Sequence, residues 1–279
     1  MTNKVAFDRM EVRGMDVDIN LITRGAPSGI PLIFLPGITS YSVSFSSILA
    51  MMPDRFYSMS MDIRGRGRST WPKRGYRLDN YVDDLLNVLN AVVGNPVAPV
   101  LVGHSMGARI AAAFASRYSR LISGMVLIDP PVNGPGQRQV YPNSLAMFLN
   151  QKAMVEQGRM DVFRGSFPNF SAAQVEERAQ EYLNVSTEAL IESYESLLRE
   201  PFHIHIKAAQ CPVLLLAAEH GDTIRPEECA VLQLLNGQLE AIRVQGVSHM
   251  IYKEAPEETA SYIVEFVDRC TSRQDGKTA

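Results

Sequence analysis

The sequence predicts a doubly wound α/β fold with one mostly parallel sheet. Two observations carry this prediction. Continuous apolar runs alternate with helical patterns along most of the chain, as strands and helices do in such folds. The segment between Asp129 and Cys211 then interrupts the alternation without a strand-like run. With 279 residues, the chain can form one large domain that carries an insertion.

The predicted strands are short apolar runs of the kind that buried parallel strands show. An alternating segment at Val12–Ile22 predicts a hairpin that turns near Gly14, ahead of the parallel strands. The parallel strands are expected at Pro31–Leu35, Phe56–Met61, Val97–Val102, Met125–Ile128, Val213–Ala217 and, with a more mixed pattern, Leu239–Val244.

Helical patterns separate these runs. They lie at Ser44–Met52, Leu78–Val93, Ala108–Tyr118, Cys229–Leu235 and Pro256–Asp268, and the interrupting segment adds Ser144–Gln157, Ala172–Leu183 and Thr187–Leu198. Ligands of parallel sheets bind beyond the carboxyl ends of the strands. We therefore interpret residues 130–210 as a helical cap over a binding site, and residues 1–129 and 211–279 as the core.

Composition narrows the class of protein. The 27 Lys and Arg against 30 Asp and Glu give a net charge of −3, which offers no electrostatic attraction for nucleic acid or an anionic membrane. Three scattered cysteines indicate neither a disulfide framework nor a zinc site. The N-terminus lacks the apolar stretch of a signal peptide. We expect a soluble cytoplasmic protein that acts on a small molecule.

The most informative motif is Gly103-His104-Ser105-Met106-Gly107. A predicted strand ends just before this G-x-S-x-G sequence and a predicted helix follows it, which is the context of a nucleophile elbow. Such a turn presents its serine at a helix N-terminus, so Ser105 is the predicted nucleophile. The backbone N–H of Met106 is then placed where an oxyanion forms.

A second oxyanion donor is expected from the loop after the strand Pro31–Leu35. This loop reads Leu35-Pro-Gly-Ile-Thr39, and Gly37 permits a close approach of the backbone. The N–H of Ile38 is the candidate donor. Thr39 and Ser40 lie nearby for contact with a substrate.

A serine hydroxyl needs a base, and five histidines are available. His249 follows the last predicted strand, which is the terminal position expected of the base in the chain order serine, acid, histidine. His104 lies inside the elbow, where its side chain is expected to point away from the base that serves Ser105.

Two carboxylates can orient the His249 imidazole. Asp129 ends the strand Met125–Ile128, and Asp222 follows the strand Val213–Ala217. Spacing along the chain favours Asp222, because most members of such folds use that position. The other carboxylate is then expected to cap a loop or a helix.

With these residues in place, the chain resembles the α/β-hydrolases over nearly its whole length. It also resembles the N-formylmaleamate deformylases of nicotinate degradation and, more distantly, 2-(acetamidomethylene)succinate hydrolase. The similar blocks are LPGITS (35–40), DIRGRGRS (62–69), GHSMGAR (103–109) and DPPVNGPGQR (129–138), followed by Tyr141-Pro142. The arginines of DIRGRGRS, in a loop common to the fold, are interpreted as structural: Arg64, Arg66 and Arg68.

The resemblance implies a reaction and reverses one preference. In the deformylases the acid follows the strand that corresponds to Met125–Ile128, which points to Asp129. The implied reaction is the deformylation of N-formylmaleamate to maleamate and formate, with no metal or organic cofactor. Candidates for binding the substrate carboxylate are Arg138, Tyr141, Thr39 and Arg109.

Three alternative functions stay open at this point. A carboxylesterase and a hydrolase of carbon–carbon bonds use the same set of residues on the same fold. A receptor that binds a small acidic metabolite with little turnover is the alternative from another class.

Overall fold

The structure, a computed structural model, describes residues 6–92, 97–132, 136–138, 144–221 and 223–275. Among these residues one sheet has the strand order β1-β2-β4-β3-β5-β6-β7-β8. Strand β2 pairs antiparallel with β1 on one side and with β4 on the other, and every other pair of neighbouring strands is parallel. The strands are β1 (Asp8–Val12), β2 (Ile19–Arg24), β3 (Ile30–Leu35), β4 (Phe56–Met61), β5 (Val100–His104), β6 (Gly124–Ile128), β7 (Val213–Ala218) and β8 (Leu239–Val244). The predicted fold class is confirmed.

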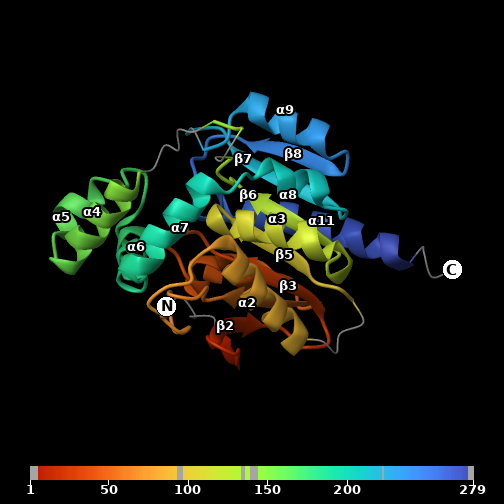
Figure 1. The fold of residues 1–279 in the computed structure, drawn as a ribbon, viewed down its shortest axis with the longest axis horizontal. Coiled ribbons are helices and arrows are strands. Elements are labelled where there is room, and N and C mark those ends of the chain that lie inside the picture. Colours follow the sequence, from red (N-terminus) through yellow and green to blue (C-terminus); the bar gives the residue numbers. More distant parts are fainter. Residues whose placement is uncertain (1–5, 93–96, 133–135, 139–143, 222, 276–279) are drawn as a thin grey trace.

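Helices cover both faces of the sheet (Figure 1). One face carries α2 (Leu78–Ala91), α3 (Met106–Tyr118), α8 (His203–Ala208) and α9 (Pro226–Leu235), and the other carries α1 (Ser46–Met51) and α11 (Pro256–Asp275). Successive side chains of a strand point to opposite faces. In β3, accordingly, Ile33 and Leu35 join the apolar core under α2 and α3, whereas Leu32 and Phe34 join the core under α1 and α11.

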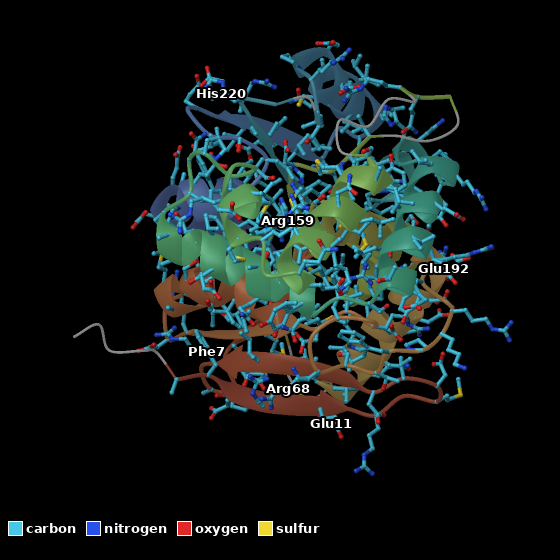
Figure 2. All side chains as sticks on the ribbon, turned by 90° about the vertical axis from the view of Figure 1, so that its left-hand side faces the viewer. Phe7, Glu11, Arg68, Arg159, Glu192 and His220 are labelled. Carbon is cyan, nitrogen blue, oxygen red and sulfur yellow. The ribbon has the colours of Figure 1, made fainter. Side chains whose placement is uncertain are left out.

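Between β6 and β7 lies a group of helices that stands at one side of the sheet (Figure 1). Figure 2 looks onto this group, with Arg159 near the centre of the visible face. An aromatic cluster packs inside it, in which the rings of Phe163 and Tyr182 meet edge to face. Its helices, before the chain enters α8, are α4 (Leu145–Glu156), α5 (Met160–Arg164), α6 (Ala172–Leu183) and α7 (Thr187–Arg199).

The junction between α6 and α7 is joined to the core by backbone hydrogen bonds. The N–H of Gly67 donates to the carbonyl of Asn184 over 2.8 Å, and the N–H of Ser186 donates to the carbonyl of Gly65 over 2.9 Å. Arg66 and Val185 form an isolated antiparallel bridge between them. The loop at residues 65–67 therefore holds the base of this helical group.

The predicted hairpin is present, because β1 and β2 pair antiparallel across a connection that includes Gly14, but its predicted bounds of Val12–Ile22 are wrong. Strand β1 begins at Asp8, and the connection to β2 spans residues 13–18. β1 is an edge strand in which only Val12 is buried, so its first residues carry no apolar alternation for the sequence to reveal. The last helix also continues past the predicted Asp268 to Asp275, where its polar residues give no hydrophobic signal.

Candidate active site

A cavity of about 260 Å³ lies beyond the carboxyl ends of the strands, between the sheet and the helices inserted after β6. The core supplies Gly37–Ser40, His104, Ser105, Ser248–Met250 and Glu254 to its wall. The inserted segment supplies Met147, Phe148, Gln151, residues 166–170, Arg178 and Tyr182. One side of the cavity is thus rich in polar groups and the other in aromatic rings.

Ser105 sits at the turn between β5 and α3 in a strained backbone conformation. Its φ of 54° and ψ of −115° are rare for a residue with a side chain. The flanking glycines make the turn sterically possible. A Cβ on Gly107 would lie 1.9 Å from the Leu35 carbonyl oxygen, and a Cβ on Gly103 would lie 2.4 Å from the backbone of Gly107. The turn therefore exposes Ser105 to the cavity.

His249 lines the same cavity and contacts Asp129 on its other side. Its Nδ1 lies 2.7 Å from Asp129 Oδ2, and Thr223 Oγ1 lies 3.3 Å from the same nitrogen. The Ala218 N–H donates to Asp129 Oδ1 over 3.1 Å, which fixes the buried carboxylate at the end of β6. The carboxylate engages Nδ1, so Nε2 is the ring nitrogen left to exchange a proton with a group in the cavity. Asp222 lies outside the described residues.

The two predicted oxyanion donors flank the elbow. Ile38 lies in the loop after β3 and lines the cavity, and Met106 is the first residue of α3. The first N–H groups of a helix have no acceptor within it. Among the described residues, neither of these two N–H groups has an acceptor in the protein. Two groups that are free to donate thus belong to residues close to Ser105, since Met106 follows it directly and the Gly37 position lies against the Ser105 side chain.

His104 lies beside His249, contrary to the expectation from the motif. The two ring centroids are 4.6 Å apart, and His104 Nε2 donates to the His249 carbonyl over 2.9 Å. Burial, reinforced by the nearby His249, holds the pKa of His104 well below its ordinary value. His104 is therefore a neutral ring that supports the backbone of His249.

The two predicted substrate-binding arginines lie elsewhere. Arg138 forms an ion pair with Glu228, with its Nε 2.8 Å from Oε1, and Arg109 donates to the Pro131 carbonyl over 2.8 Å. Neither is among the described residues that line the cavity. Thr39 does line it, and Tyr141 lies outside the described residues.

The sequence analysis missed a buried charged cluster in the cavity wall. Arg178, on α6, donates to Glu181 and to the hydroxyl of Thr39. Lys253 Nζ lies 2.6 Å from Glu181 Oε1. Arg178 Nε is buried and has no hydrogen-bond partner among the described residues. The i, i+3 spacing of Arg178 and Glu181 was the one signal in the sequence, and it is common on helix surfaces.

Two cations and one anion leave this cluster with one positive charge. Burial alone would raise the pKa of Glu181, but the charges of Lys253 and Arg178 outweigh it and lower that pKa from 4.5 to about 2. The Glu254 carboxylate on the same wall is held by the N–H and the hydroxyl of Ser248. Arg178 therefore contributes a positive, partly unpaired guanidinium to the wall of the cavity.

We expect Glu181→Gln to lower the free energy of unfolding near pH 7 by about 3 kcal/mol, from the difference between the two pKa values. The pKa is lower in the folded protein, so the carboxylate stabilises the fold above pH 4.5. That stabilisation is lost as the pH falls towards about 2. Urea unfolding between pH 3 and pH 7 measures this, and Glu177→Gln on the exposed side of α6 is the control. A wild-type pH dependence in Glu181→Gln would contradict the assignment.

The comparisons with known proteins place the chain in a family. Residues 32–262 match the model of the alpha/beta hydrolase family. The chain is therefore a member of that family and a hydrolase.

Two relatives with named activities are similar to the chain over most of its length. The chain is 31% identical over 226 residues to an N-formylmaleamate deformylase of Pseudomonas putida, covering 80% of this chain and 83% of the relative. It is 26% identical to a 2-(acetamidomethylene)succinate hydrolase of Mesorhizobium japonicum, and the match covers 96% of this chain and 99% of the relative. The crystal structure of an N-formylmaleamic acid deformylase from Pseudomonas putida S16 superposes with a TM-score of 0.84 at 27% identity, covering 92% of this chain and all of that one.

The described residues were also compared with the patterns of metal sites and of membrane-spanning helices. Among the described residues, no group of three or more His, Cys, Asp or Glu side chains is arranged to hold a metal ion. Within the same ranges, no helix has both the length and the apolar character to cross a membrane.

Proposed function

We propose that the protein is a serine hydrolase that removes the formyl group from N-formylmaleamate, giving maleamate and formate. The contact of 2.7 Å between His249 Nδ1 and Asp129 carries this proposal, because it orients His249 in the cavity that Ser105 also lines. The similarity to the deformylase supports the choice of substrate.

The proposed reaction proceeds by acyl transfer to the serine. His249 takes the proton of Ser105, whose oxygen attacks the formyl carbon. The N–H groups of Ile38 and Met106 stabilise the oxyanion, and the loss of one such donor costs roughly 3 kcal/mol. His249 then gives its proton to the amide nitrogen, and maleamate leaves. A water molecule that His249 deprotonates releases formate from the formyl-serine.

Arg178 is the proposed partner of the substrate carboxylate. Arg178 lines the cavity, its buried Nε has no partner among the described residues, and its cluster carries a net positive charge. The hydroxyl of Thr39, which already accepts from Arg178, adds a polar group beside it. A charged hydrogen bond to a carboxylate would use both features.

Formate release tests the proposed function. The purified protein is offered N-formylmaleamate, and formate is measured with an enzyme-coupled assay. Rapid release that saturates supports the deformylase. Turnover of p-nitrophenyl acetate without formate release would instead favour a carboxylesterase, to which the aromatic wall of Phe148, Phe167 and Phe170 is suited. Labelling of Ser105 by a fluorophosphonate without turnover of any acyl substrate would favour a receptor.

We expect Arg178→Gln to raise KM for N-formylmaleamate about 10- to 100-fold and to change kcat little, because a charged hydrogen bond to the bound substrate is lost. The fold should tolerate the change, since Glu181 keeps its partner Lys253. Arg138→Ala is the matched variant, and its KM should stay within about twofold, because the Arg138 side chain pairs with Glu228. A raised KM in Arg138→Ala but not in Arg178→Gln would return the binding role to Arg138.

A further inference from the structure

Arg66 is a fully buried guanidinium behind the loop that carries Ile38. Its Nε and one terminal nitrogen both donate to the Ile38 carbonyl oxygen, each over 3.1 Å. The same terminal nitrogen lies 3.8 Å from the Met106 sulfur. The other terminal nitrogen donates to the Arg64 carbonyl over 2.9 Å and to the Tyr81 hydroxyl over 3.0 Å. Arg66 therefore touches both residues whose N–H groups are the proposed oxyanion donors.

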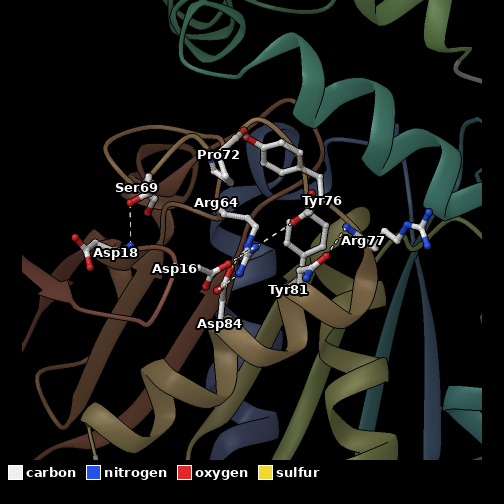
Figure 3. Close-up of polar contacts among 12 residues, drawn as sticks. Asp16, Asp18, Arg64, Ser69, Pro72, Tyr76, Arg77, Tyr81 and Asp84 are labelled. Atoms are coloured by element: carbon white, nitrogen blue, oxygen red, sulfur yellow. Dashed lines mark hydrogen bonds and ion pairs between the residues drawn. The ribbon is translucent and has the colours of Figure 1, made fainter.

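No carboxylate contacts Arg66 among the described residues. Its acceptors are carbonyls, hydroxyls and a sulfur atom. Arg64, two residues earlier, has the ordinary arrangement, since two of its nitrogens lie 2.6 Å from the Asp84 carboxylate (Figure 3). Removing a cation from water costs several kcal/mol, which a paired carboxylate offsets for Arg64 but not for Arg66. A buried cation without a carboxylate partner destabilises the fold, which indicates that Arg66 serves the function of the protein.

The contacts of Arg66 restrain the peptide that follows Ile38. Two parallel N–H donors on one carbonyl oxygen fix the direction of that peptide group. The preceding peptide, which carries the Ile38 N–H, is held at its own carbonyl, because the Ser40 N–H donates to the Gly37 carbonyl over 3.1 Å. The two adjacent peptide groups are therefore both restrained. A further partner of Arg66, Ser193 at 2.9 Å, belongs to α7 in the inserted segment. Arg66 thus connects the loop after β3, the elbow and the inserted helices.

We propose that Arg66 is a positioning residue for the oxyanion site. By fixing the Ile38 carbonyl it restrains the short loop that carries the Ile38 N–H, and its positive charge lies in contact with both donor residues. Donors that are fixed in advance, in a site shielded from water, stabilise the negative charge that develops in the transition state. The sequence analysis interpreted this arginine as structural. The inference rests on the proposed acyl transfer at Ser105.

The test replaces Arg66 with Met, which keeps the volume, and with Lys, which keeps the charge. Turnover of p-nitrophenyl acetate is measured per site labelled by a fluorophosphonate, so a smaller folded fraction does not count as slower chemistry. We expect Arg66→Met to lower kcat about 100-fold, as for the loss of one oxyanion donor, with KM within about threefold. Arg66→Lys should recover part of the loss, because the charge remains while the paired donors do not.

Arg109→Met is the matched control. Arg109 is also buried and also donates to backbone carbonyls, but these are the carbonyls of Pro131 and Glu200, neither of which is a proposed oxyanion donor residue. Its loss should reduce the thermal stability as the loss of Arg66 does, and leave kcat per labelled site within about threefold. A trifluoromethyl ketone, which mimics the tetrahedral intermediate, should lose affinity for Arg66→Met in proportion to kcat/KM.

The outcomes separate this inference from the proposed function. Wild-type protein that neither labels nor turns over the ester would overturn both. A wild type that is active, together with an Arg66→Met variant of unchanged kcat per labelled site, would overturn the role of Arg66 alone. Should Arg66→Met give no folded protein, Arg66→Lys decides the question: a kcat at least about fivefold below wild type supports the role, and wild-type kcat overturns it.

Discussion

Ser105→Ala is expected to slow formate release from N-formylmaleamate about 10⁴- to 10⁶-fold, the largest effect that we predict for a single substitution. The variant lacks the oxygen that forms the acyl bond, so only substrate binding and the oxyanion donors remain to accelerate hydrolysis. The change removes one small polar atom at a turn whose shape depends on the neighbouring glycines. The fold and the affinity for maleamate should therefore be kept, and calorimetry of maleamate binding checks this.

Ser166→Ala is the control for this experiment. Ser166 also lines the cavity, but on the side of the inserted helices, and its rate should stay within about threefold of wild type. Equal formate release by Ser105→Ala and wild type would contradict the assignment of the nucleophile. The protein would then remain a hydrolase of the family with its reacting group elsewhere.

The sequence predicts those parts of the fold that depend on residues close together in the chain. The apolar runs of β3 and β5 are buried on both faces, so each run alone identifies a central parallel strand. The elbow is equally local, because the two glycines that permit the turn lie within two residues of Ser105. The exposed edge strand β1 has no such pattern, and its position was predicted wrongly.

The charged cluster in the cavity wall could not be predicted in the same way. Arg178 meets Thr39 across 139 positions of the chain, and Lys253 meets Glu181 across 72. Only the folded chain brings α6 and the loop after β3 together, and burial then turns ordinary surface residue types into a positive site. Arg138 is the opposite case. The sequence made it a candidate for binding the substrate, but in the folded chain it forms an ion pair with Glu228 on α9.

The choice between Asp129 and Asp222 leads to the second large prediction. Asp129→Asn is expected to lower kcat about 10³- to 10⁴-fold. The amide group of an asparagine can donate to His249 Nδ1, which would place the ring proton on Nε2, where it blocks removal of the Ser105 proton. The Ala218 N–H can still donate to the side-chain oxygen, so the loop at the end of β6 should keep its shape.

Asp222→Asn is the comparison that decides the assignment, and its kcat should stay within about threefold of wild type. Both kcat values are measured by formate release per site labelled with a fluorophosphonate at long exposure. Wild-type kcat in Asp129→Asn together with a loss of about 10³-fold in Asp222→Asn would make Asp222 the acid. That result would require His249 to turn from a contact of 2.7 Å with Asp129, so the structure favours the opposite outcome. A rate loss in both variants beyond about 10²-fold would mean that both carboxylates are needed to orient the histidine.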